Sequence, residues 1–537
     1  MLSDIEIIQN AQLKPISEIG QKLSLTNENM TKYGDYMAKI DYRLAYRDGR
    51  LGKLILVTGT NPGPAKVGKT TVAIGLADAI ASRGKNACVC LREPLISSII
   101  DDKIDGTGSG YSQVVPTENI KLHFTGDTHA IESANNLLST MIEHHIAEGN
   151  ELKIDPDKII WRRCVEITDP QLKTIKIGEK DTVTGFDIAS ASEIMSVLCL
   201  SRTLSELKDN LGNMVIGYTK TDKPVYCRQL HMEGAMTAIL KDAFNPNLVQ
   251  TLEGTPAIIH GSPMPALSTG CNSIIATKTA MSLSNFAVTE AEFGSEIGAE
   301  KFIDIICPRL SFGPDCIVIV TTVASLKHQG GGKLEDGLSH LGKHICNMEG
   351  YNIPVVVAIN AVEGDLPEEY SLIGEHCENL ETKWEIVTCH DEGEYGARAL
   401  ANTVIDLCSQ STDSIVTAYG YDNTIIQRAN ELATTIYGAS AMSFTIEAAQ
   451  MCKKIEDMGL ATLPICVAKT ELSFSDNAKL LGSPENFIIS CVDIKLFAGA
   501  GLIVLICGGI STMPDISKKP KVDEIDVDID GNIMGLA

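Results

Sequence analysis

The hydrophobic pattern changes after residues 1–52, a polar stretch that predicts helices and few strands. Residues 54–57 are all apolar and predict a short buried strand, followed by a loop rich in Gly and Pro at residues 59–68. Apolar residues at helical spacing then predict a helix over residues 70–82, and residues 87–91 predict a second strand. Strand, loop, helix and strand in this order form the unit of a parallel sheet flanked by helices.

The composition narrows the possible partners. The chain has 537 residues, with 45 Lys and Arg against 69 Asp and Glu, and a formal net charge of −24. With this net negative charge, we expect no binding to nucleic acid or to an anionic membrane surface through the electrostatic field of the whole protein. Any bound anion therefore needs a local binding site that favours negative charge. The N-terminus is acidic, no apolar run reaches the about 20 residues of a spanning helix, and the cysteines are scattered; we therefore expect a cytoplasmic protein.

The loop after the first strand contains an anion-binding motif of this kind. Residues 63–70 read Gly-Pro-Ala-Lys-Val-Gly-Lys-Thr and match the phosphate-loop pattern G-x-x-x-x-G-K-[ST]. Gly63 and Gly68 let backbone N–H groups turn toward phosphate oxygens at the positive end of the helix. Lys69 is expected to reach the β- and γ-phosphates, and the Thr70 hydroxyl to ligate Mg²⁺. A purely structural strand–helix turn is the alternative, but the setting favours nucleotide binding.

The wider pattern predicts the fold class. Further apolar runs at residues 316–321 and 354–359, and at 487–491 and 502–506, are typical of strands. We expect an α/β fold with a P-loop NTPase-like, mostly parallel sheet and flanking helices, plus two smaller α/β domains. Residues 1–365 are predicted to form a nucleotide-binding domain with an N-terminal helical segment. Residues 366–455 are predicted to form a helix-rich second domain, and residues 456–537 a C-terminal α/β domain.

A second candidate site follows the second strand, at Leu91-Arg92-Glu93-Pro94. The carboxyl ends of parallel strands face the ligand crevice of such sheets. Arg92 is therefore expected near a phosphoryl oxygen and Glu93 near a cation. A surface ion pair is the alternative for this dipeptide.

With these residues assembled, the chain resembles the formate–tetrahydrofolate ligase (10-formyltetrahydrofolate synthetase) family over nearly its whole length. The matching segments are residues 64–65, 68–71, 91–94, 110–111, 113–116, 122–127, 186–188, 191–195, 247–257, 260–261, 270–273, 298–302, 468–470 and 512–514. The resemblance implies that formate attacks the γ-phosphate of MgATP to give formyl phosphate, whose formyl carbon is then attacked by the N10 amine of tetrahydrofolate. It also implies a homo-oligomer, since the family often forms tetramers.

The resemblance also assigns roles to individual residues. Lys69, Thr70 and Thr71 hold the nucleotide phosphates. Arg92 stabilises formyl phosphate, and Glu93 helps to form a site for an activating monovalent cation, K⁺ or NH₄⁺. Asp127 and His260 line the reaction centre, where His260 is the candidate for removing the amine proton.

Some positions depart from the family pattern. In the phosphate loop, Lys66-Val67 replaces the usual Gly-Glu. In the folate pocket, Val362 stands where the family has a stacking Phe, and Cys389 where it has a Trp. The loss of two aromatic contacts of about 1 kcal/mol each predicts a KM for tetrahydrofolate raised roughly tenfold or more.

Three hypotheses follow. The first is an active ligase with weak folate affinity, which the presence of Lys69, Arg92 and Asp127 favours. The second is a catalytically impaired member that acts as a nucleotide-binding or interaction protein, which Val362 and Cys389 favour. The third is a P-loop ATPase or ligase that acts on another carboxylate.

Overall fold

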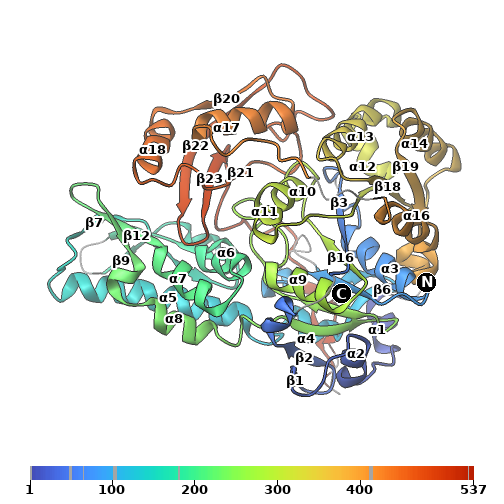
Figure 1. The fold of residues 1–537 in the computed structure, drawn as a ribbon, viewed down its shortest axis with the longest axis horizontal. Helices are drawn as coiled ribbons and strands as arrows, with labels where there is room; N and C mark the ends of the chain where they lie inside the picture. Colours follow the sequence, from blue (N-terminus) through green and yellow to red (C-terminus); the bar gives the residue numbers. More distant parts are fainter. Residues whose placement is uncertain are drawn as a thin grey trace.

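The computed structural model describes residues 3–47, 51–63, 66–100, 106–178, 182–410, 415–529, 531 and 533–536. Its largest feature is a 12-stranded sheet in the order β1-β2-β14-β15-β4-β16-β3-β17-β18-β19, with β5 and β6 off this path (Figure 1). The strands in that order are Met30–Tyr33, Met37–Ile40, Asn247–Thr251, Pro256–Ile259, Ala87–Leu91, Phe286–Glu290, Lys53–Gly59, Cys316–Thr321, Val355–Asn360 and Lys383–Val387, then Gly108–Ser109 and Ser112–Val115.

The strands from β15 to β19 run parallel to one another. Both faces of this part are covered, so alternate residues of each strand enter two different cores. On β3, Leu54 and Leu56 belong to one buried cluster and Ile55 and Val57 to the other. Helix α3 (Lys69–Ala81) and α16 (Arg398–Cys408) cover one face, and α9 (Ile274–Leu283) covers the opposite one. The predicted α/β class with a mostly parallel sheet and flanking helices is confirmed.

The prediction for residues 1–52 was incomplete. This segment forms α1 (Asp4–Gln9) and α2 (Ile16–Lys22), but it also forms the antiparallel hairpin β1–β2, which extends the main sheet through β14. Each hairpin strand has four residues, and β1 buries only its first one. Such short edge strands carry too few apolar positions to show the period of two that predicts a strand.

A second unit lies beside the main sheet, at the left in Figure 1. Its helices are α5 (Asp127–Ala147), α6 (Glu193–Leu200), α7 (Leu204–Asn213) and α8 (Glu233–Leu240). They pack with small sheets formed by β13 (Pro224–Tyr226), β12 (Val215–Thr219) and β7 (Ile154–Ile159), by β11 (Phe186–Ile188) and β8 (Arg163–Val165), and by β10 (Thr182–Thr184) and β9 (Ile175–Ile177).

A third unit contains the four-stranded sheet β20-β22-β23-β21, flanked by α17 (Ile425–Leu432) and α18 (Ile446–Asp457). Its strands are Ala441–Phe444, Ile488–Phe497, Leu502–Cys507 and Ile465–Ala468, so the predicted strands near the C-terminus are confirmed. Because β19 pairs in the main sheet and β20 pairs with β22, residues 366–455 contribute to both sheets. The domain limits at 365 and 455 remain predictions.

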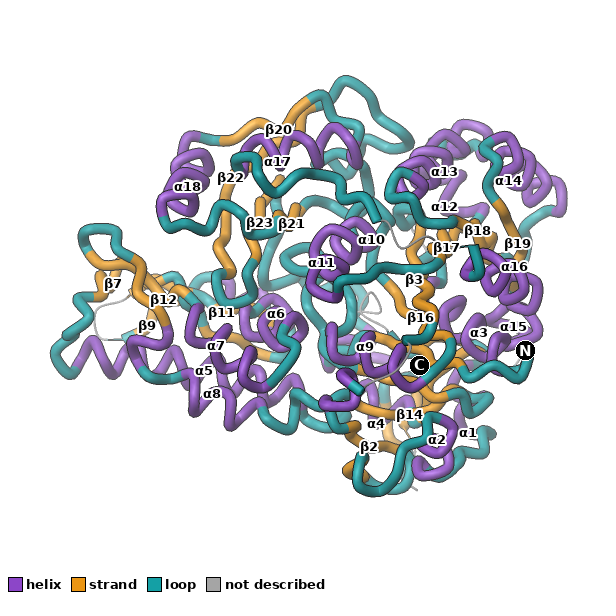
Figure 2. The backbone as a smooth tube through the Cα atoms, viewed as in Figure 1, coloured by secondary structure: helices purple, strands orange, loops and turns teal. Residues whose placement is uncertain are grey.

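The remaining elements complete the fold (Figure 2). They are α4 (Thr117–Lys121), α10 (Gly298–Lys301), α11 (Cys307–Leu310), α12 (Val323–Gln329), α13 (Leu334–Glu349), α14 (Pro367–Asn379), α15 (Cys389–Glu392), β24 (Asp526–Val527), β25 (Ile533–Met534) and short 3₁₀ and π segments. Among the helices of the described residues, none is both long and apolar enough to cross a membrane.

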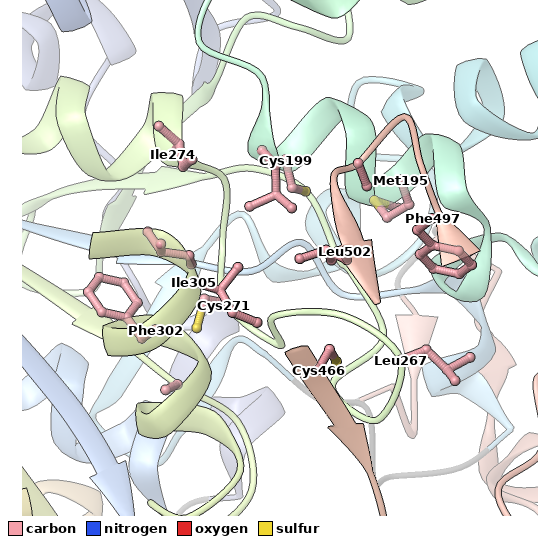
Figure 3. Close-up of a cluster of buried hydrophobic side chains, with 14 of the residues drawn as sticks. Met195, Cys199, Leu267, Cys271, Ile274, Phe302, Ile305, Cys466, Phe497 and Leu502 are labelled. Atoms are coloured by element: carbon pink, nitrogen blue, oxygen red, sulfur yellow. The ribbon is translucent and has the colours of Figure 1, made fainter. Parts of the chain in front are cut away.

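A shared core joins the three units. Figure 3 shows Met195 and Cys199 of α6 gathered with Phe302 and Ile305, which follow α10, and with Leu502 of β23. All five side chains are buried in one hydrophobic cluster. The units therefore pack as one body around the parallel sheet, which fixes the strand ends that carry the site.

Candidate active site

The phosphate loop joins β3 to α3 at the carboxyl edge of the parallel strands. Gly68, the residue before α3, has a φ of +80°, a conformation that strongly favours glycine. A Cβ atom at this position would lie 2.4 Å from Nδ2 of Asn360, which donates a hydrogen bond of 3.0 Å to the carbonyl oxygen of Val67. Asn360 at the end of β18 therefore holds the loop, and only glycine fits at position 68. Pro64 and Ala65 lie outside the described residues.

The helix start is arranged to receive an anion. Among the described residues, no side chain caps the N-terminus of α3, which is 13 residues long, so its first N–H groups point along the positive end of the helix dipole. Thr71 is buried and shares a hydrogen bond of 2.9 Å with the hydroxyl of Ser109. Gly63 lies after β3, and Gly68, Lys69, Thr70 and Thr71 lie where the loop joins α3.

Glu290, the last residue of β16, is the acidic partner of this loop. The hydroxyl of Thr70 donates a hydrogen bond of 2.7 Å to Oε2 of Glu290. Oε1 of Glu290 is buried and has no hydrogen-bond partner among the described residues. Burial, and then the charge of Glu292, raise the pKa of Glu290 to about 7. A hydroxyl and a carboxylate oxygen without a partner, both beside the phosphate loop, are donors that Mg²⁺ prefers.

Arg92 lies at the carboxyl end of β4, next to β16 in the sheet. Nη2 of Arg92 forms an ion pair of 2.5 Å with Oε1 of Glu292, and the two side chains are 8% and 15% exposed. Nε of Arg92 is buried and has no hydrogen-bond partner in the described part of the chain. Burial opposes ionisation of Glu292, but the positive charges of Arg92 and Lys69 outweigh it and lower the pKa of this carboxyl.

Asp127 begins α5 and takes part in a buried ion pair. Nζ of Lys39 lies 2.7 Å from Oδ1 and 2.9 Å from Oδ2 of Asp127. Asn247 donates a further hydrogen bond of 2.9 Å to Oδ2. Asp127 is therefore held rigidly, with its negative charge balanced by Lys39.

Glu93 follows Arg92 in the chain, close enough to this ion pair to feel both of its charges. Burial, and then the charge of Asp127, raise the pKa of Glu93 well above its usual range, although Lys39 opposes the shift. Glu93 lines a cavity of about 220 Å³, whose walls also include Thr128, His129 and Glu166. The cavity thus collects carboxylate and hydroxyl oxygens around one buried acid.

His260 follows β15 and is completely buried. Its Nε2 lies 2.7 Å from the carbonyl oxygen of Ala243, so Nε2 must carry the proton, and Nδ1 accepts from the hydroxyl of Ser273 at 2.6 Å. Burial lowers the pKa of His260 to about 4. Both ring nitrogens are engaged, which leaves neither free to take a proton from a substrate amine in this arrangement.

The two residues of the predicted folate pocket lie at equivalent places but in different environments. Val362 and Cys389 each stand two residues beyond the paired ends of β18 and β19, Asn360 and Val387. Val362 is 52% exposed, whereas Cys389 is completely buried against α3, where a Cβ on Gly75 would lie 2.8 Å from its sulfur. The Cys389 side chain faces the core, so it offers no surface to a ligand.

The structure therefore gathers Lys69, Thr70 and Arg92 at one edge of the sheet, with Glu93 next to Arg92 in the chain and Asp127 near Glu93. Sequence reasoning missed Glu290 and Glu292, although an apolar strand that ends in Thr-Glu-Ala-Glu was a usable signal. It also missed Lys39, because nothing local links this residue to Asp127. In the described part of the chain, no group of three or more His, Cys, Asp or Glu side chains is arranged to hold a metal ion.

The fold and the site define a nucleotide-binding protein of the P-loop α/β class. The sequence model of the family "Formate--tetrahydrofolate ligase" matches residues 2–537. A curated relative, the formate–tetrahydrofolate ligase of Psychrobacter sp. (strain PRwf-1), is 44% identical over 564 residues, covering 99% of each chain. The chain belongs to the formate–tetrahydrofolate ligase family. The predicted family and its activity, the ATP-dependent ligation of formate to tetrahydrofolate, are confirmed, and the impaired-member alternative is not favoured.

Proposed function

We propose that this chain performs the reaction of its family with the residues gathered at the carboxyl edge of β3, β4 and β16. The observation that carries the assignment is the close set of Thr70, Glu290 and Arg92 beside the phosphate loop, in which the hydroxyl of Thr70 donates a hydrogen bond of 2.7 Å to Glu290. Phosphoryl transfer requires mainly alignment and neutralisation of charge, and this set supplies both.

In the phosphoryl step, the N-terminus of α3 and Lys69 hold the phosphates of ATP. The hydroxyl of Thr70 and the unpartnered Oε1 of Glu290 are the residues that would hold Mg²⁺, which supplies charge neutralisation on the phosphates when bound. Gly68 keeps the loop backbone close to the phosphates, because any side chain there would strike Asn360. Formate attacks the γ-phosphorus in this frame, the bond from the γ-phosphorus to the bridging oxygen breaks, and ADP leaves, which gives formyl phosphate.

In the second step, Arg92 stabilises the acyl phosphate while the amine of tetrahydrofolate attacks the formyl carbon, and inorganic phosphate leaves as its bond to that carbon breaks. Its buried Nε–H is a donor still available for an anionic oxygen. The nearby cavity around Glu93 fits a monovalent cation, because Glu93, Thr128 and Glu166 place oxygens around it. A bound cation there would offset the burial and the Asp127 charge that now favour the protonated form of Glu93.

Asp127 and His260 complete the site as positioning residues. The ion pair of Asp127 with Lys39 ties the start of α5 to β2, and His260 ties β15 to Ser273, which caps α9. The proton of the amine leaves to another acceptor, since His260 is neutral and fully hydrogen-bonded. The homotetramer expected from the resemblance remains a proposal, which light scattering on the purified protein tests.

The experiment compares Lys69→Ala and Arg92→Ala with the parent protein. Lys69→Ala should lose MgATP binding, measured by calorimetry, and all ADP formation. Arg92→Ala should still bind MgATP but lose formate-dependent phosphoryl transfer, measured by rapid quench. Unfolding curves check that both variants fold. An equal loss of nucleotide binding in both variants would contradict the separate roles.

A further inference from the structure

The most unusual feature of the site is that its arginine is already occupied by a carboxylate of the same chain. Oε1 of Glu292 lies 2.5 Å from Nη2 of Arg92. Neither side chain is exposed beyond 15%, so solvent screens this ion pair weakly. Arg92 is therefore not an open receptor in the structure but one that holds an anion.

Glu292 carries the functional group of the substrate. Its side chain ends in a carboxylate, and formate is a carboxylate with only a hydrogen atom attached. An arginine fork binds carboxylates through two parallel N–H groups, and the Glu292 contact uses Nη2 only. The adjacent Nε–H is buried without a hydrogen-bond partner among the described residues. Arg92 thus has one donor engaged by Glu292 and a second donor left for another anion.

The backbone around Glu292 is fixed from several sides. The N–H of Glu292 donates to the carbonyl oxygen of Gly270 at 3.1 Å, and the N–H of Ala291 donates to that of Val57 at 2.9 Å. The next residue, Phe293, has a φ of +60°. A bulky residue in this left-handed region is strained by about 1–3 kcal/mol and persists only where its surroundings impose it. The backbone of this segment therefore holds Glu292 in place beside Arg92.

We propose that Glu292 is an internal competitor for formate at Arg92, and that it sets how much formate the enzyme needs. This inference rests on the proposed function, in which Arg92 receives the reacting carboxylate and then the acyl phosphate. To bind, formate must share or take the guanidinium from Glu292. The negative charge of Glu292 also repels a second anion at this place.

The proposal separates the effects on KM and on kcat. Glu292→Gln keeps the length and the acceptor oxygen of the side chain but removes its charge. The hydrogen bond to Arg92 then weakens from a charged one to a neutral one, and formate binds more tightly. We expect the KM for formate to fall roughly tenfold, the change that corresponds to one charge-assisted hydrogen bond, with a kcat within about twofold. The KM for MgATP should change less.

A purely structural role of Glu292 predicts the opposite. If Glu292 only holds Arg92 in place, removal of its charge loosens the guanidinium, so that the KM for formate rises and kcat falls. Glu292→Asp provides a second variant, since it keeps the charge but shortens the reach to Arg92. It should give an intermediate fall in the KM for formate.

The experiment is a formate titration at saturating MgATP and tetrahydrofolate, with ADP release as the readout. Parent protein, Glu292→Gln, Glu292→Asp and Glu143→Gln are compared. Glu143 forms an ion pair of 2.7 Å with Arg163, between α5 and β8, so Glu143→Gln controls for the loss of an arginine-bound glutamate elsewhere. Unfolding curves of all four proteins confirm that they are folded.

A fall in the KM for formate in Glu292→Gln, with a smaller fall in Glu292→Asp and none in Glu143→Gln, supports the proposal. An unchanged or higher KM in Glu292→Gln overturns it. Calorimetric titration of formate in the presence of MgADP gives the same comparison without turnover. Tighter formate binding by Glu292→Gln supports the competitor role, and equal or weaker binding refutes it. If the parent shows no formate-dependent ADP release, the proposed function fails by itself, and this binding comparison still decides the role of Glu292.

Discussion

Gly68 offers the sharpest test of the phosphate loop, because the chain contains a matched control. Alanine at position 68 would have to adopt a φ of +80°, which costs about 1–2 kcal/mol for a residue with a side chain. Its Cβ would also lie 2.4 Å from Nδ2 of Asn360, and moving that amide would break its 3.0 Å hydrogen bond to Val67, worth about 1 kcal/mol. Gly68→Ala should therefore lower the free energy of unfolding by about 2–3 kcal/mol.

Gly84 has a φ of +72°, but no atom of the described residues lies within 4 Å of the position of its Cβ. Gly84→Ala should thus lose only the backbone contribution of about 1–2 kcal/mol and bind MgATP like the parent. In Gly68→Ala the displaced loop should weaken MgATP binding by at least about tenfold, or 1.4 kcal/mol. Urea unfolding and calorimetry measure both quantities. If the two variants lose equal stability and both bind MgATP normally, the assigned geometry of the loop is wrong.

Three further predictions use the buried acids and the core. Glu290 must lose its proton to ligate a cation, and its pKa is raised to about 7, so MgATP affinity should increase from about pH 6 to pH 8. Glu290→Gln should abolish this pH dependence, and the same pH dependence in both proteins would refute the role of Glu290. Burial also raises the pKa of Asp78 from 3.8 to about 7, so the folded state retains a proton that the unfolded state loses. The free energy of unfolding should therefore fall by at most about 4 kcal/mol as the pH rises from about 4 to 7. Asp78→Asn should flatten that fall in urea unfolding; a fall of equal size in the variant would contradict the assignment. Cys389→Trp should reduce expression and melting temperature, because the completely buried sulfur leaves no room for an indole; a stable variant that binds tetrahydrofolate more tightly would show that this side chain faces the pterin.

The sequence sufficed to predict the central β3–α3 unit, because its periodicity, its glycines and its motif all depend on neighbouring residues. The same reasoning placed Arg92 at a ligand-facing strand end. It did not predict the hairpin β1–β2, whose two four-residue strands join the sheet by pairing of β2 with β14, about 200 residues away.

The sequence also did not predict contacts between side chains that lie far apart along the chain. Lys39 pairs with Asp127 and Glu292 with Arg92, at separations of 88 and 200 residues. The role first expected for His260 depended on which groups surround the ring, and only the structure shows that Ala243 and Ser273 occupy both nitrogens. The surroundings of Cys389 could not be predicted for the same reason. A residue just after β19 can either line a ligand pocket or pack into the hydrophobic core.

The central claim is that this edge of the sheet joins formate to tetrahydrofolate at a nucleotide site. The most direct measurement is ADP release with MgATP alone, with added formate, and with formate and tetrahydrofolate together. We expect little ADP release with MgATP alone and sustained ADP release with both substrates, accompanied by 10-formyltetrahydrofolate in equal amount. ADP release that is the same in all three mixtures, or no formylated product, would contradict it.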